Sequence, residues 1–143
     1  MRFQSLMVPA FALLTLAGLA PAPQAQAQMP AYLHAISDLR AAREYLRTDA
    51  RPRSAAAREA AIQEISRAID EIKIAARDDG KNPFFTPPPQ GGDPAWPLHS
   101  AVRLLREARH DVDHGFDLPE NRGLRERSVQ HIDRALELLT PYL

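Results

Sequence analysis

Two histidines in the last third of the chain have the spacing of metal ligands. His110 and His114 are four positions apart, so their imidazoles project from the same side of a helix. Such a pair holds zinc, copper or nickel when further ligands complete the coordination shell, and Asp111, Asp113 and Asp117 are close in sequence. The apolar positions around the pair predict that both imidazoles face solvent. The pair is therefore either a divalent-metal site or an exposed pair without a role.

A second polar group is expected at one end of the molecule. Asp78 and Asp79 end a predicted helix, where the helix dipole disfavours a carboxylate by up to about 1 kcal/mol. If successive helices alternate in direction, the same end contains two helix starts with His34 and His99, and Lys81 is adjacent in sequence. These residues either form a small site for a metal or another ligand, or they only cap helices and form ion pairs.

An unusual segment follows this group. Residues 81–96 read KNPFFTPPPQGGDPAW, and three consecutive prolines favour an extended path. Loops of this length are uncommon in compact domains and are often functional or disordered. Phe84, Phe85 and Trp96 therefore form either an exposed recognition surface or a cover over one end of the core.

An internal repeat indicates which elements hold these side chains. Residues 35–43 are echoed by residues 101–109, and residues 65–70 by residues 132–137. The offset is 66 to 67 positions. Each copy contains two helical segments, so the chain carries one helical hairpin twice.

Apolar residues at helical spacing predict four helices and no strand. The predicted helices run from Ala31 to Thr48, from Ser54 as N-cap to Gly80, from either Asp93-Pro94 or Trp96-Pro97 to Gly115, and from about Asn121 to 140. Each carries one apolar stripe, of which the clearest members are Ile62, Ile65, Ile69, Ile72, Leu98, Ala101, Val102, Leu105, Val129, Ile132, Leu136 and Leu139.

The expected fold is an all-α, up-down-up-down four-helix bundle built from two repeated hairpins. The first hairpin comprises about residues 31–80, residues 81–96 are the linker, and the second hairpin comprises about residues 97–140. An open solenoid is the alternative, but solenoids need three or more repeats for stability.

The N-terminal segment predicts export. Arg2 is followed by an apolar run from Leu6 to Ala20 and then by Ala25-Gln26-Ala27. A charged start, a short apolar core and an A-x-A sequence are typical of a secretory signal peptide. We expect residues 1–27 to be removed by cleavage after Ala27, which leaves a periplasmic or secreted domain of residues 28–143. The run is too short for a membrane span.

Composition excludes several classes of function. The chain balances 18 basic against 18 acidic residues and contains no cysteine. It therefore lacks the basic excess that nucleic-acid binding requires, and it has neither disulfides nor thiolate chemistry. The chain contains no glycine-rich phosphate loop and no Gly-x-Ser-x-Gly sequence. We therefore expect a protein that is not an enzyme.

Several stretches resemble a family of small exported bacterial helical proteins without an assigned activity. They are residues 33–40 (LHAISDLR), 68–73 (AIDEIK), 78–81 (DDGK), 123–125 (GLR) and 131–133 (HID). The resemblance covers most of residues 28–143. It implies export and a helical fold, and it assigns no catalytic residue.

Two functions follow as expectations. The first is a non-enzymatic binding or scaffolding module for an unknown protein or small ligand, acting through the linker aromatics and the adjacent Asp78, Asp79, His34 and His99. The second is a divalent-metal-binding protein that uses that group or His110 and His114. No nucleic acid, no membrane span after cleavage and no other cofactor are expected, and a homodimer stays open.

Overall fold

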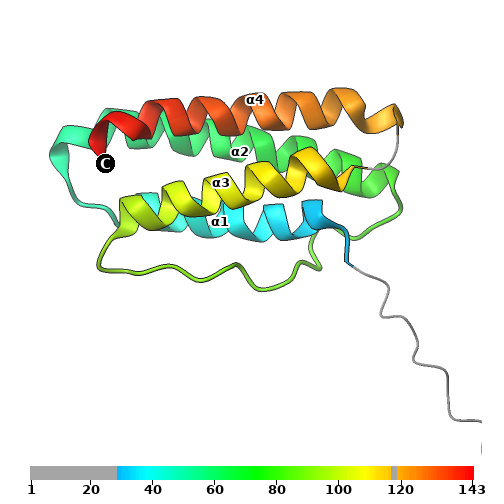
Figure 1. Ribbon diagram of the computed structural model, residues 1–143, viewed down its shortest axis with the longest axis horizontal. Coiled ribbons are helices and arrows are strands. Elements are labelled where there is room, and N and C mark those ends of the chain that lie inside the picture. Colours follow the sequence, from blue (N-terminus) through cyan, green and yellow to red (C-terminus); the bar gives the residue numbers. More distant parts are fainter. Residues whose placement is uncertain (1–28, 117–118) are drawn as a thin grey trace, which may run out of the picture.

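The computed structural model describes residues 29–116 and 119–143, and in this part of the chain the fold is all-helical without strands (Figure 1). The predicted all-α fold of four packed helices is therefore confirmed. The predicted signal peptide of residues 1–27 lies outside the described residues. The four long helices are α1 (Ala31–Thr48), α2 (Ala55–Asp78), α3 (Pro97–Gly115) and α4 (Arg122–Leu139).

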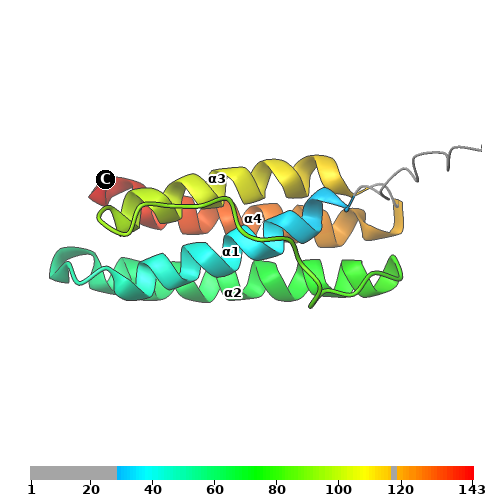
Figure 2. The same ribbon diagram turned by 90° about the horizontal axis from the view of Figure 1, so that it is seen from below.

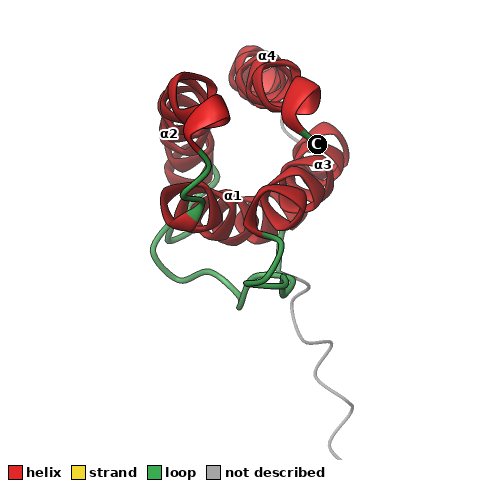
Figure 3. Ribbon diagram, turned by 90° about the vertical axis from the view of Figure 1, so that its left-hand side faces the viewer, coloured by secondary structure: helices red, strands yellow, loops and turns green. Residues whose placement is uncertain are grey.

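The order of the helices differs from the expected up-down-up-down arrangement. Helix α1 packs mainly on α3, and α2 packs mainly on α4, with smaller contacts within each hairpin (Figure 3). Helices α1 and α4 run in one direction, whereas α2 and α3 run in the other (Figure 1). The prediction was wrong because it treated the linker as a turn at one end, whereas the linker runs along the whole bundle (Figure 2).

The linker is long enough for this path. Residues 81–96 number 16, and in a polyproline-like conformation they reach about 50 Å. Helix α2, with 24 residues, is only about 36 Å long. Helix α3 can therefore begin at the end of the bundle where α2 also begins.

Hydrogen bonds fix the linker along α1. The backbone N–H of Gln90 donates to Asp38 Oδ1 at 2.7 Å, and the Ser37 hydroxyl donates to the carbonyl oxygen of Pro87. From α3, Arg103 Nη2 donates to the carbonyl oxygen of Gln90 at 3.0 Å. Because buried backbone groups need partners, these contacts allow an irregular segment to pack against the helices.

The two repeats meet at equivalent positions. Glu64 and His131 are 67 residues apart, which is the repeat offset in this half of each hairpin, and their side chains are in contact. Ile65 and Ile132, which are also equivalent, are both fully buried. The two hairpins are thus related by an approximate two-fold axis that passes between the antiparallel helices α2 and α4.

The core follows the predicted stripes with a small rotation on α4. Val129 and Leu136 of α4 are only partly buried against the core, as is Ile62 of α2. Helix α4 contacts both α2 and α3, so its buried face is centred between those two neighbours. The buried residues of α4 are Ser128, Ile132, Ala135 and Leu139.

Local signals explain the end of α2. Gly80 has a φ of 67°, a conformation that glycine adopts without a steric penalty. The N–H groups of Gly80 and Lys81 donate to the carbonyl oxygens of Arg77 and Ala76 at 2.9 and 2.7 Å, which is the Schellman pattern. The predicted C-terminal signal is therefore confirmed. Ser54, the predicted N-cap, makes no side-chain capping hydrogen bond.

Gly115 ends α3 for a different reason, namely the close approach of α1. A Cβ atom at this position would lie 2.9 Å from the backbone nitrogen of Tyr32 and 3.0 Å from Ala31 Cβ. Glycine is therefore needed here because the start of α1 leaves no room for a side chain.

We predict that Gly115→Ala lowers the free energy of unfolding by about 1–3 kcal/mol, because the added methyl group meets backbone that cannot move away freely. Urea unfolding followed by circular dichroism measures the change. The control is Gly91→Ala, where an added Cβ has nothing within 4 Å, and its unfolding midpoint should be unchanged or slightly higher. Equal midpoints for both variants would contradict the prediction.

Candidate functional site: the end pocket

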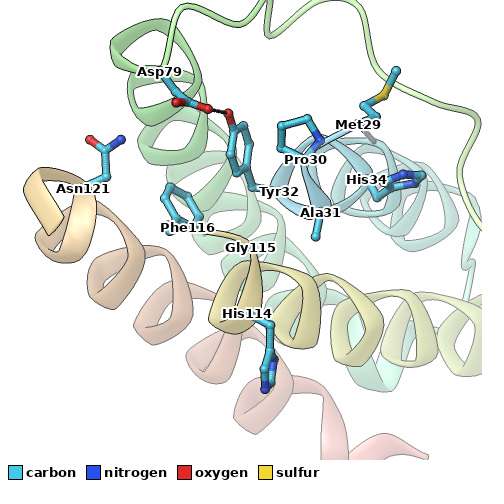
Figure 4. Close-up of a pocket in the computed structure, with 10 residues that line it drawn as sticks. All are labelled: Met29, Pro30, Ala31, Tyr32, His34, Asp79, His114, Gly115, Phe116 and Asn121. Atoms are coloured by element: carbon cyan, nitrogen blue, oxygen red, sulfur yellow. Dashed lines mark hydrogen bonds between the residues drawn. The ribbon is translucent and has the colours of Figure 1, made fainter. Parts of the chain in front are cut away.

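A pocket of about 550 Å³ opens where α1 begins and where α2 and α3 end (Figure 4). The helix order creates it, because antiparallel packing of α1 on α3 brings the last turn of α3 beside the first turn of α1. We call it the end pocket. Its lining combines apolar residues near the start of α1 with six larger aromatic or polar side chains: Tyr32, His34, Asp79, His114, Phe116 and Asn121.

The inner wall consists of Tyr32, Asp79 and Phe116. The Tyr32 hydroxyl donates a hydrogen bond to the Asp79 carboxylate, and the Tyr32 and Phe116 rings lie 5.0 Å apart between centroids at 36° (Figure 4). The compensation expected for Asp79 thus comes from the first turn of α1, through a side chain. Asp78 and Lys81 are exposed and do not line the pocket.

The five-residue group predicted at this end is only partly correct. His34 lines the pocket, but His99 is at the opposite end, where its ring lies 5.9 Å from that of Trp96. Because α3 runs parallel to α2, its last turn and not its first lies at this end. That turn brings His110 and His114 to the end expected to hold His99.

His110 and His114 stack on the surface of α3. Their ring centroids are 4.3 Å apart, and His114 Nδ1 lies 2.8 Å from the carbonyl oxygen of His110. Asp113 is exposed and Asp111 is half-buried, while Asp117 lies outside the described residues. Within the described ranges, no group of three or more His, Cys, Asp or Glu side chains could hold a metal ion. Metal binding stays a prediction.

The linker aromatics are exposed, and Trp96 lies at the other end of the bundle from the adjacent Phe84 and Phe85. Phe84 and Phe85 are 69% and 71% exposed, and Trp96 is 63% exposed. The alternative in which these rings cover the end of the core is therefore wrong. Lys73 Nζ lies 6.0 Å from the centroid of the Phe84 ring, near the end of α2, whereas Trp96 precedes α3 at the other end (Figure 1).

The sequence reasoning missed a buried carboxylate beneath the linker. Asp38 is only 1% exposed. Its Oδ1 accepts the N–H of Gln90, while its Oδ2 is buried without a hydrogen-bond partner among the described residues. Burial raises the pKa of Asp38 above its ordinary value, the Gln90 N–H opposes the shift, and the charges of Asp111 and Glu107 reinforce it.

A signal for this buried acid was present in the repeat. With the 66-residue offset that relates α1 to α3, Asp38 corresponds to Leu104. Leu104 is fully buried, so the repeat places an acidic side chain at a core position. An alignment of the two copies would have identified it.

We predict that Asp38→Asn raises the free energy of unfolding at pH 7 by about 1–3 kcal/mol, because the amide removes a buried charge. The raised pKa means that the folded chain binds this proton more tightly than the unfolded chain does. The contribution of Asp38 to stability is therefore greatest at low pH, and it falls as the pH rises through the raised value. The advantage of the variant should shrink as the pH falls toward the ordinary value of 3.8.

Thermal melts across this pH range measure the effect. Asp70→Asn is the matched control, because the Asp70 side chain is 74% exposed, and its melting temperature should stay close to that of the wild type. A variant Asp38→Asn that is less stable than the wild type by the same amount at every pH would contradict the prediction.

Comparisons with protein-family models, with curated proteins and with solved structures find no match to this chain. The family resemblance therefore stays untested. Among residues 29–116 and 119–143, no helix has the length and apolar character to cross a membrane.

Proposed function

We propose that the protein is an exported, non-enzymatic binding module that holds a small ligand in the end pocket. The observation that supports this proposal is the inner wall, in which two aromatic rings and a carboxylate border one hollow. Its volume of about 550 Å³ is within the range of small-molecule sites, about 300–1,000 Å³. Export is inferred from the signal-peptide pattern, and the absence of catalysis from the lack of known catalytic motifs in the sequence.

The lining favours a ligand with a flat apolar part and a positive charge. Tyr32 and Phe116 supply aromatic surface, and Asp79 supplies a negative charge at the end of α2. No Lys or Arg is among the described residues that line the pocket. A cationic group near Asp79 is attracted in this partly enclosed site, and aromatic faces also attract cations. His34 and His114 belong to the lining, but their rings point away from the wall of Tyr32, Asp79 and Phe116 (Figure 4).

We predict that benzylamine binds more tightly than benzyl alcohol or benzoate, which have the same ring and a neutral or negative group. Titration followed by ¹H–¹⁵N NMR should show shifts that centre on the lining residues. Asp79→Asn should weaken benzylamine binding by about tenfold, which corresponds to 1.4 kcal/mol. The adjacent Asp78→Asn is the control, because Asp78 is exposed and outside the lining, and it should leave the affinity unchanged.

Two results would refute the proposal. One is benzoate binding as tightly as benzylamine, and the other is an equal effect of the Asp78 and Asp79 substitutions. Zinc titration tests the metal alternative in the same experiment. A dissociation constant below about 10 μM, lost in His110→Ala and in His114→Ala, would replace the small-ligand proposal with metal binding.

A further inference from the structure

A second polar hollow lies on the face that α2 and α4 form together, with a volume of about 590 Å³. We call it the face hollow. It shares no residue with the end pocket. Its main charged side chains are Glu64 and Arg67 from α2 and His131, Asp133, Arg134 and Glu137 from α4.

Glu64 holds the side chains around it in place. It is 9% exposed, and each carboxylate oxygen has a different partner. Oε1 accepts Arg67 Nη1 at 3.0 Å, and Oε2 lies 2.6 Å from His131 Nδ1. A carboxylate partner favours a proton on that nitrogen. Nε2 of His131 has no hydrogen-bond partner in the described part of the chain, and it is not closed off from solvent.

The charges around the hollow leave hydrogen-bond donors available. Glu64 is compensated by Arg67 and His131. Asp133 accepts two hydrogen bonds from Arg109, at 2.5 and 3.3 Å. Arg134 is exposed and has no hydrogen bond or ion pair with any residue that the structure describes. Two of the three carboxylates are therefore neutralised, and Glu137 alone opposes an anion.

The repeat explains why guanidinium groups come from both helices. Arg67 and Arg134 occupy equivalent positions, as Glu64 and His131 do. The approximate two-fold axis therefore places one arginine from each repeat beside the central Glu64–His131 pair. Arg67 forms an ion pair with Glu64, so Arg134 is the arginine of this pair that is available to a ligand.

We propose that the face hollow binds a small tetrahedral oxyanion, either inorganic phosphate or the phosphate group of a monoester. Arg134 donates hydrogen bonds to the anion, and Gln130, also in the lining, supplies an amide donor. Nε2 of His131 adds a third donor when the imidazole carries a proton on both nitrogens, because in the neutral ring with the proton on Nδ1 it is an acceptor. The arginine fork suits phosphate oxygens. Glu64 is a positioning residue that holds the imidazole of His131, and Arg67 holds Glu64 in turn.

Calorimetric titration at low ionic strength with inorganic phosphate and with phenyl phosphate tests the proposal. Arg134→Gln should weaken phosphate binding by about tenfold or more. This exposed substitution should leave the thermal melt unchanged. Arg122→Gln is the matched control, because Arg122 is an exposed arginine of the same helix outside the hollow, and it should change the affinity by less than about twofold. Glu64→Gln should weaken binding through a less firmly held His131.

A stronger response to phenyl phosphate than to phosphate would assign the site to monoesters, and an equal response would assign it to the free anion. The absence of saturable binding would overturn the proposal, and so would an equal loss in Arg122→Gln and Arg134→Gln. Asp79→Asn should leave phosphate binding intact. A loss of binding in that variant would place the anion in the end pocket and overturn the proposal.

Discussion

Antiparallel packing of each helix on its counterpart in the other repeat determines the arrangement of this molecule. Two equivalent helices that pack antiparallel must cross at equivalent residues, and α2 and α4 do so at Glu64 and His131. Identical copies would place two glutamates together in a nearly buried position, where like charges repel. The chain instead has an acid in one copy and an imidazole in the other, so the same contact becomes attractive.

The same packing dictates the path of the linker. For α3 to lie antiparallel to α1, it must begin where α1 ends, at the far end from the last residue of α2. The linker must then span the bundle, which suits an extended, proline-rich segment. Its backbone polar groups need partners along the way, and Ser37, Asp38 and Arg103 provide them. The cost is a buried carboxylate whose second oxygen has no partner among the described residues.

The sequence was sufficient for the features that depend on local patterns. Helical periodicity predicts the four helices, and Gly80 marks the end of α2 because its conformation is set within a few residues. The direction of α3 could not be predicted, because a 16-residue linker reaches either end of the bundle, and the error placed His99 beside His34. The Glu64–His131 contact follows from the repeat offset, but only once the hairpins are known to pack antiparallel.

The end pocket lies where the two copies differ, whereas the face hollow contains one arginine, Arg67 or Arg134, from each copy. Ile65 and Ile132 fill equivalent positions with the same side chain, as the shared core requires. In contrast, the equivalents of Tyr32 and His34 in α3 are Leu98 and Ser100, which are buried. The hollow at the start of α3 is therefore lined by other side chains, namely Asp93, Trp96, His99, Ser100 and Arg103. Packing accounts for Tyr32, because its hydroxyl donates to Asp79 and its ring contacts Phe116. The two ends of the bundle thus present different groups, so a ligand that recognises the wall of Tyr32, Asp79 and Phe116 would meet that wall at one end only.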